Sequence, residues 1–211
     1  MKVAGKSVIV KKQHRHSEAF DILKYGDDFI MKNVCIFLAN GFEEIEAVTA
    51  ADMLRRASIG VNIVSLTGNI QVAGKNRILL TADILHEDAD YSAVDMLILP
   101  GGMPGTENLM KSSALTELIR SFNQTGRYIA AICAAPIVLG KAGILKGVKA
   151  ACYPGFEDQL GGAVPSTERC VVSGNIITSR GPGTALEFAL TLITLLAGKE
   201  KSDTLSKTVL A

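Results

Sequence analysis

From residue 33 onward, the chain alternates short continuous apolar runs with longer stretches whose apolar residues recur at helical spacing. Strands formed from continuous apolar runs would be buried on both faces, as in a mostly parallel sheet covered by helices. The pattern therefore predicts an α/β fold. The predicted strands cover residues 34–39, 61–67, 94–100, 128–133, 149–153 and 176–179.

Helices are predicted between these strands, where apolar residues recur every three or four positions and Pro or Gly marks the ends. They cover residues 43–57, 113–124, 136–142 and 184–197. A last amphipathic helix, 200–210, could pack back on the chain or pair with a partner. Two hairpins are also expected, one from residues 70–73 and 77–80 appended to the main sheet, the other from 170–173 and 175–178.

Residues 1–30 differ from the rest, with six Lys or Arg, four Asp or Glu and little periodicity. We predict that they form an N-terminal extension outside a single domain at 31–211, and translation could also start at Met31. His14 and His16 could in principle contact a metal. A pair at this spacing in a basic segment is more often solvated surface, and no metal site is expected.

Composition limits the classes of partner. With 22 Lys and Arg against 21 Asp and Glu, the net charge of +1 predicts neither stable nucleic-acid binding nor attraction to an anionic membrane. Uncharged apolar stretches such as 188–198 are well short of the roughly 20 residues of a membrane helix. Lysines at 6, 11 and 12 interrupt any signal-peptide core. We expect a cytoplasmic protein that handles small molecules.

Cys133 is the first candidate for chemistry. It ends the apolar run 128–133, and the chain then turns through Ala134 and Ala135 into Pro136 and a helix. A helix that starts directly behind a thiol directs its positive end at the sulfur, which favours thiolate. Cys133 is therefore a candidate nucleophile, although most free cysteines behave as small buried hydrophobes.

The other three cysteines have no metal-site spacing and indicate reduced thiols. Cys152 lies at the end of the next predicted strand, where it could serve as a resolving thiol for Cys133 or pack in the core. Cys35 and Cys170 lie within strand patterns and are interpreted as packing residues.

Two other turns would meet Cys133 at the carboxyl edge of a parallel sheet, where ligands bind. One carries Gly101 and Gly102, whose amides could stabilise an anion. The other opens a helix with Glu43, Glu44 and Glu46, and the helix dipole alone can explain the first two.

Glu46 shares a helical face with Ala50, Met53 and Ala57, so its carboxyl could be desolvated, protonated and hydrogen-bonded to the thiolate. Periodicity does not decide between Glu46 and Glu43.

A Cys-His hydrolase is poorly supported, because it needs an imidazole beside the thiol. His86 is the one histidine after residue 30, and its polar surroundings, 85–90, indicate an exposed loop.

Four segments in this order resemble the signature blocks of the ThiJ/PfpI superfamily, specifically its Parkinsonism-associated protein deglycase or glyoxalase III branch. They are residues 41–46 (GFEEIE), 99–105 (LPGGMPG), 130–136 (AAICAAP) and 178–184 (TSRGPGT). The resemblance spans about 33–211. It implies a flavodoxin-like sandwich of the class I glutamine amidotransferase type, usually a homodimer.

The resemblance also implies roles for individual residues. Cys133 would be the nucleophile on a strained strand-to-helix elbow, and Glu46 a protonated carboxyl on its sulfur. Gly101, Gly102 and Ala134 would surround the oxyanion, with the amides of the last two as donors. The substrate site would also include the side chains of Arg180, near the pocket mouth and a dimer contact, and Tyr153.

The implied activity is cofactor-free conversion of methylglyoxal or glyoxal to lactate or glycolate without glutathione, together with repair of early glycation adducts on protein or nucleotide. Redox sensing with chaperone-like protection, using the same cysteine, is the alternative. Ala134 stands where the protease branch has histidine, which argues against peptidase activity. Tyr153 stands where the deglycase branch often has histidine, which removes an imidazole from the site.

Overall fold

The main sheet contains seven strands within the described part of the chain, and all of them are parallel except β10, which runs antiparallel to β11. The computed structural model describes residues 31–211, so the expectations for residues 1–30 and for His14 and His16 lie outside the described residues. In spatial order the strands are β10 (Cys170–Ser173), β11 (Ile176–Ser179), β7 (Tyr128–Ile132), β6 (Met96–Leu99), β1 (Asn33–Leu38), β2 (Gly60–Ser65) and β5 (Ile84–Leu85).

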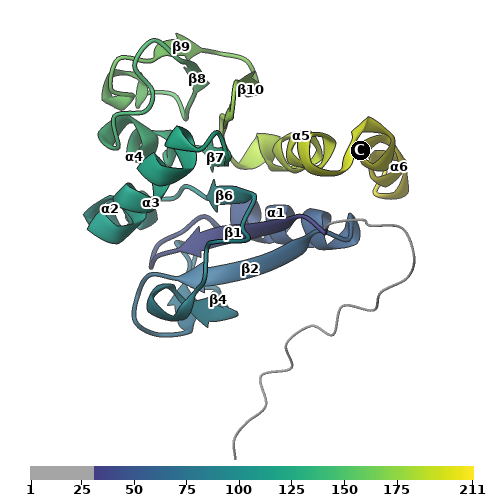
Figure 1. Cartoon of the computed structure of the whole chain (residues 1–211), viewed down its shortest axis with the longest axis horizontal. Helices are drawn as coiled ribbons and strands as arrows, with labels where there is room; N and C mark the ends of the chain where they lie inside the picture. Colours follow the sequence, from purple (N-terminus) through teal and green to yellow (C-terminus); the bar gives the residue numbers. More distant parts are fainter. Residues whose placement is uncertain (1–30) are drawn as a thin grey trace, which may run out of the picture. The chain divides into compact units, whose positions relative to one another are not determined.

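Helices cover both faces of this sheet (Figure 1). One layer contains α1 (Glu44–Arg56) and α5 (Ala185–Ala197), with α6 (Lys199–Thr208) packed on α5. The other layer contains α2 (Gly105–Lys111), α3 (Ser113–Gln124) and α4 (Pro136–Lys141). The predicted α/β sandwich is confirmed.

The central strands feed two separate apolar cores, because successive side chains point to opposite faces. In β1, Val34, Ile36 and Leu38 pack with the α1 and α5 layer, while Cys35 and Phe37 pack with the α3 and α4 layer. Strands β6 and β7 alternate in the same way. Burial on both faces explains why the sequence shows continuous apolar runs.

The helices agree with the sequence pattern to within two residues at each end, except that α2 was not predicted. The stretch before α2 is rich in Gly and Pro, which masks a helix of seven residues. Ser112 separates α2 from α3 and caps the latter, since its Oγ accepts a hydrogen bond from the amide of Leu115 at 3.1 Å.

One strand prediction was wrong in its placement. Residues 149–153 form only β8 (Lys149–Ala151), which pairs with β9 (Val164–Ser166) instead of joining the main sheet. The amide of Ala151 donates to Oγ1 of Thr178 in β11 at 2.8 Å. A side-chain hydrogen bond thus links β8 to β11 in place of backbone strand pairing. The short strands β9 and β5 were not predicted.

Both predicted hairpins occur. The first, β3 (Gln71–Ala73) with β4 (Leu79–Thr81), forms its own two-stranded sheet rather than an extension of the main one. It is attached through the amide of Gly41, which donates to the carbonyl of Ala73 at 2.8 Å. The second hairpin is β10 with β11.

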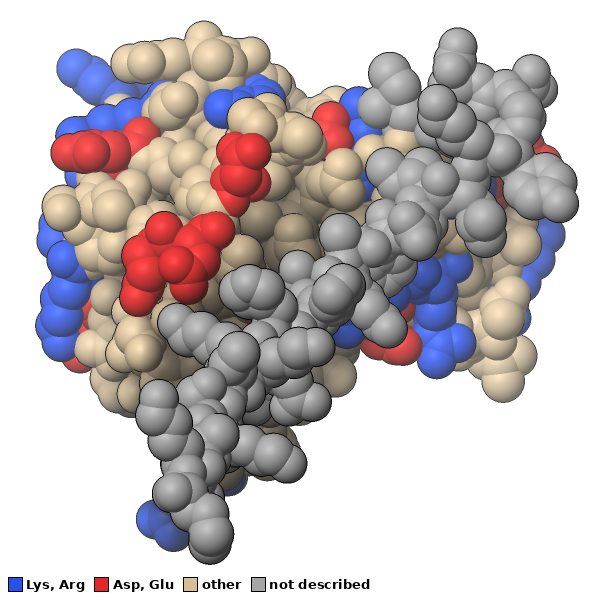
Figure 2. All heavy atoms as spheres, turned by 60° about the horizontal axis from the view of Figure 1, so that its bottom comes forward, with Lys and Arg blue, Asp and Glu red and all other residues tan. Residues whose placement is uncertain are grey.

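Acidic and basic side chains both lie on the face that Figure 2 shows, in keeping with the nearly balanced charge of the chain. Among the helices of residues 31–211, none combines the length and the apolar character needed to span a bilayer.

Candidate active site

Cys133 lies on a tight elbow between β7 and α4, with a φ of 64°. This left-handed conformation is uncommon for a residue with a side chain, and it persists only where neighbours hold it. Two backbone hydrogen bonds hold it here: the Cys133 amide donates to the carbonyl of Ser179 at 3.0 Å, and the Cys133 carbonyl accepts from the amide of Tyr153 at 2.8 Å. The thiol side chain is thus held at the carboxyl edge of the sheet.

The glycine turn after β6 packs directly against this elbow. A Cβ on Gly101 would lie 2.7 Å from the Cβ of Cys133, so a side chain is excluded there. Gly102 has a φ of 88°, which a residue with a side chain rarely adopts. The amides of Gly102 and Ala134 hydrogen-bond toward the sulfur and lower its pKa. These two donors are placed to stabilise negative charge at the thiol.

Glu46 is the acid of the site. It is 1% exposed, and its helical neighbours Ala50, Met53 and Ala57 are buried as the sequence pattern predicts. Its Oε2 accepts the amide of Gly101 at 2.7 Å, so Gly101 holds the carboxyl rather than an oxyanion. Within residues 31–211, its Oε1 has no hydrogen-bond partner of normal geometry, although the Cys133 thiol is close enough to lower the pKa of the acid.

The two groups depend on each other for their charge. Burial raises the pKa of Glu46 to about 7, against the opposing effects of the Gly101 amide and the Cys133 thiol. Burial, and then the charge of Glu46, raises the pKa of Cys133 to about 12. Burial thus disfavours the charged form of both groups, whereas the amides of Gly102 and Ala134 favour the thiolate expected from the sequence.

The two neighbouring carboxylates have structural contacts. Glu44 accepts hydrogen bonds from the amide of Asn76 at 2.7 Å and from its Nδ2 at 2.9 Å, which attaches the turn of the β3–β4 hairpin to α1. Glu43 forms an ion pair with Lys75 at 3.7 Å. Glu46 differs from Glu43 and Glu44 because its carboxyl accepts the amide of Gly101.

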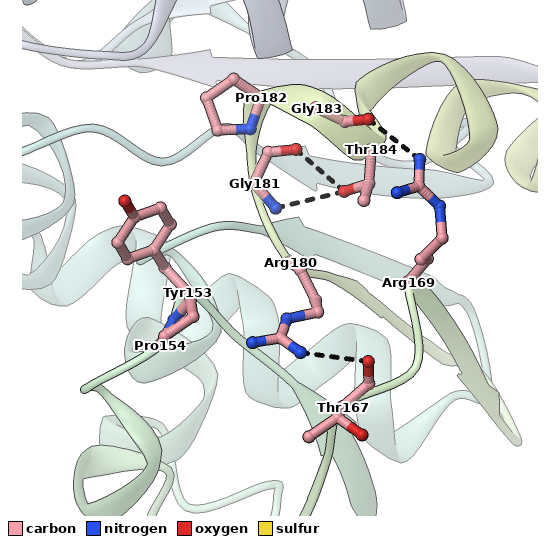
Figure 3. A pocket seen from close by; sticks show the side chains of 9 residues that line it. All are labelled: Tyr153, Pro154, Thr167, Arg169, Arg180, Gly181, Pro182, Gly183 and Thr184. Carbon is pink, nitrogen blue, oxygen red and sulfur yellow. Dashed lines mark hydrogen bonds between the residues drawn. The ribbon is translucent and has the colours of Figure 1, made fainter.

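A cavity of about 370 Å³ lies beside the elbow (Figure 3). Two of its wall residues, Tyr153 and Arg180, had been expected in the substrate site. The Tyr153 amide donates to the Cys133 carbonyl, and Arg180 follows Ser179, whose carbonyl accepts the Cys133 amide. Sequence reasoning did not identify the others, and a position such as Arg169 carries no sequence signal. The lining residues are Tyr153, Pro154, Thr167, Arg169, Arg180, Gly181, Pro182, Gly183 and Thr184.

The remaining thiols and His86 lie away from this arrangement. Cys152 is buried in the core of the α3 and α4 layer, whereas Cys133 belongs to the core of the other layer, so the structure offers no support for Cys152 as a resolving thiol. Burial raises the pKa of Cys152 to about 11 and that of Cys35 to about 12.

His86 was expected in an exposed loop, but it is half-buried in a short 3-10 helix. Its Nδ1 lies 2.6 Å from the hydroxyl of Tyr91, and β6, β1 and β2 separate its strand edge from β7. Within residues 31–211, no group of three or more His, Cys, Asp or Glu is arranged to hold a metal ion.

Known proteins share this arrangement of sequence and fold. The model of the DJ-1/PfpI family matches residues 32–195. The chain is 40% identical over 181 residues to Protein dj-1beta of Drosophila melanogaster, which covers 85% of this chain and 97% of the relative. It is 36% identical over 168 residues to a protein of Caenorhabditis elegans named glutathione-independent glyoxalase DJR-1.2, covering 78% of this chain and 88% of the relative.

A longer relative and a solved structure complete the comparison. Protein DJ-1 homolog B of Arabidopsis thaliana is 41% identical over 173 residues, 81% of this chain, but the chain spans only 40% of that relative's length. The oxidized DJ-1 of Toxoplasma gondii superposes with a TM-score of 0.81 at 39% identity, covering 85% of this chain and 98% of that one. The chain therefore belongs to the DJ-1/PfpI family.

Proposed function

We propose that the protein is a glutathione-independent glyoxalase that converts methylglyoxal or glyoxal to lactate or glycolate and also acts on early glycation adducts of protein or nucleotide. The observation that carries the proposal is the contact set at the elbow, where a buried carboxyl with a pKa near 7 faces a thiol that two amides also approach. The glyoxalase name of the Caenorhabditis elegans relative supports it.

In the first step, the Cys133 sulfur adds to the aldehyde carbon while ionised Glu46 accepts the thiol proton. The oxygen of the former aldehyde develops negative charge beside the amides of Gly102 and Ala134, and it then takes the proton from Glu46. The product is a hemithioacetal, and Glu46 is again a carboxylate. A pre-formed thiolate is not needed, which agrees with the raised pKa of Cys133.

In the second step, Glu46 removes the proton from the carbon bonded to sulfur and returns it to the neighbouring carbonyl carbon, while the hydroxyl proton of the hemithioacetal passes to the oxygen of that carbonyl. This transfer oxidises the first carbon and reduces the second, giving a 2-hydroxyacyl thioester without an external oxidant. Water then cleaves the thioester and releases the hydroxy acid and the thiol. A base with a pKa near the working pH suits such a shuttle.

Glu46 would carry both proton transfers alone, because Tyr153 stands where related proteins often have histidine. Ala134 likewise offers no imidazole for a peptidase, so we propose no proteolytic activity.

The test is to incubate purified protein with methylglyoxal without glutathione and to measure lactate. We expect lactate to form in the wild type and Cys133→Ser to lose at least about 10³-fold in kcat/KM, because the nucleophile is removed. Cys170→Ser is the matched control, since Cys170 is a partly buried thiol in β10 outside the site. Lactate formation by Cys133→Ser at the wild-type rate would refute the proposal.

A second candidate function, redox sensing, is favoured by the unpartnered Oε1 of Glu46 beside the sulfur. A protonated carboxyl there could donate a hydrogen bond to a sulfinate oxygen on Cys133, with the Gly102 and Ala134 amides on the other oxygen. Mass spectrometry after graded peroxide distinguishes the two functions. Selective sulfinate at Cys133 together with negligible methylglyoxal turnover would favour the sensor.

We further propose a homodimer formed through the exposed apolar side chains of α1 and the β3–β4 hairpin. Ile45 and Leu79 are 55% and 64% exposed, and the Glu44 hydrogen bonds hold the two elements together. Large exposed apolar groups in one place are typical of interfaces.

A further inference from the structure

We propose that the cavity beside Cys133 binds a carboxylate on the substrate, with Arg180 as the residue that recognises it. The preferred substrates would then be α-oxoaldehydes that carry a negative charge. This inference rests on the proposed glyoxalase function for its chemistry, but the binding of the anion can be tested separately.

The position of Arg180 follows from the strand that carries it. Ser179 ends β11 and accepts the Cys133 amide, so the next residue, Arg180, lies beside the elbow. On the other side of Cys133, its carbonyl accepts the amide of Tyr153. Both side chains line the same cavity (Figure 3), and their links to Ser179 and to the Cys133 carbonyl place this cavity beside the backbone of the elbow.

Arg180 has unused hydrogen-bonding capacity. Its Nη1 donates to the carbonyl of Thr167 at 3.1 Å, and within residues 31–211 no carboxylate forms an ion pair with it. A guanidinium has five N–H donors, so several remain for a ligand. The side chain is half-buried, which weakens screening by water and strengthens a charge-assisted hydrogen bond.

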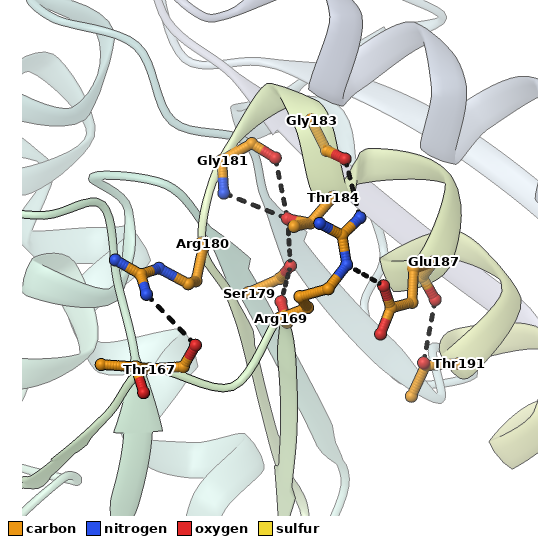
Figure 4. Close-up of polar contacts among 9 residues, drawn as sticks. All are labelled: Thr167, Arg169, Ser179, Arg180, Gly181, Gly183, Thr184, Glu187 and Thr191. Carbon is orange, nitrogen blue, oxygen red and sulfur yellow. Dashed lines mark hydrogen bonds and ion pairs between the residues drawn. The ribbon is translucent and has the colours of Figure 1, made fainter.

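Arg169, the second arginine of the cavity, differs in this respect. Its Nε donates to Oε2 of Glu187 at 2.6 Å, and its Nη2 donates to the carbonyl of Gly183 at 2.9 Å (Figure 4). Its charge is therefore neutralised by a carboxylate, and the residue is exposed. Arg180 is the cation of the cavity that lacks an anion.

The charge of Arg180 also acts on the side chain of Cys152. It lowers the pKa of buried Cys152, although burial and the charge of Glu157 act more strongly in the opposite direction. Glu157 itself accepts the amide of Gly155 at 2.7 Å and makes no ion pair with Arg180. No carboxylate of residues 31–211 therefore serves as the counter-charge of Arg180, and a ligand carboxylate would supply one.

The test compares kcat/KM for 4,5-dioxopentanoate with that for its neutral methyl ester. The anion gains water and rearranges to 2-hydroxyglutarate, as methylglyoxal would to lactate. We expect a preference of at least about tenfold for the anion in the wild type, since hydrogen bonds to charged groups contribute about this much. Arg180→Gln should remove the preference, Arg180→Lys should retain part of it, and Arg169→Gln should keep it.

Binding without chemistry is the second measurement. In Cys133→Ser protein, calorimetric titration with 4-oxopentanoate should give an affinity at least about tenfold higher than its methyl ester gives, and Arg180→Gln should equalise the two. Equal affinities in the parent protein would overturn the inference even if methylglyoxal is turned over. A retained preference without any turnover would support the anion site and refute the glyoxalase function.

Discussion

Cys133 and Glu46 occupy a space from which water is largely excluded, so the charge of one determines the ionisation of the other. The sequence shows that a helix starts behind the thiol, and this argues for a thiolate. It does not show that the thiol is only 8% exposed or that the acid is 1% exposed. Burial disfavours both charged forms, and at Cys133 burial together with Glu46 outweighs the amides of Gly102 and Ala134.

The raised pKa of Glu46 predicts a specific dependence of stability on pH. The folded-state pKa is about 7 and the ordinary value is 4.5, so between these values the folded state binds more protons than the unfolded state. The free energy of unfolding should therefore decrease as pH rises from about 4.5 to 7, with a contribution on the order of 3 kcal/mol from this group. Urea unfolding at several pH values measures it.

Glu46→Gln should lack this decrease, because the amide does not titrate. Glu44→Gln is the control: hydrogen bonds from its own amide and from Asn76 outweigh burial and lower the pKa of Glu44, so its contribution is lost as pH falls instead. If wild type and Glu46→Gln showed the same slope between pH 4.5 and 7, Glu46 would not titrate as described.

At the candidate site, the burial of Glu46 could be expected from sequence because its helical face also carries Ala50 and Met53, which are buried. The helical period did not decide between Glu46 and Glu43. The contact of the Gly101 amide with the Glu46 carboxyl could not be predicted, since it depends on how a turn of β6 meets α1. Arg169 lines the cavity because β10 pairs with β11, which brings Arg169 close to Arg180. No local sequence signal marks Arg169 as a cavity residue.

At the scale of elements, long periodic segments were predicted well and short ones were not. Helix α3 was predicted with its observed ends, because its apolar period is strong and Ser112 caps it. The seven residues of α2 and the two of β5 are too few to show a period. Strand β8 was predicted as a strand of the main sheet. Both its alanines are buried, but β8 pairs with β9 and not with a strand of the main sheet.

The β3–β4 hairpin depends on one carboxylate for its attachment to α1. Oε1 of Glu44 also lies 3.4 Å from the amide of Ile78 and accepts it, in addition to the two bonds from Asn76. We predict that Glu44→Ala lowers the free energy of unfolding by about 1–3 kcal/mol, because two part-buried backbone donors and the Asn76 side chain lose a charged acceptor. Hydrogen exchange should become faster at the amides of Asn76 and Ile78.

Asn76→Ala is the matched control for the hairpin. It removes the side-chain donor but leaves both backbone donors with Glu44, so its effect on stability should be smaller. A larger loss in Asn76→Ala than in Glu44→Ala would place the attachment elsewhere.

At the scale of the whole molecule, the class of fold was predictable because strands buried on both faces leave a continuous apolar signature. The surface that would contact a second copy was not predictable. Ile45 and Val48 follow the same helical pattern as their buried neighbours, and only the packing of α1 shows that they are 55% and 46% exposed. Ile78 and Leu79 in the adjoining hairpin are likewise exposed.

These four exposed side chains predict an isologous dimer, in which the same patch of each copy meets its equivalent. The double variant Ile45→Asp with Leu79→Asp should dissociate it, because two buried charges per copy would lack partners. Light scattering after size-exclusion chromatography should give a dimer for the wild type and a monomer for the variant. Val164→Asp tests specificity, since Val164 is 55% exposed on β9, outside the patch, and its variant should stay dimeric. A double variant that remained dimeric would exclude this surface as the interface.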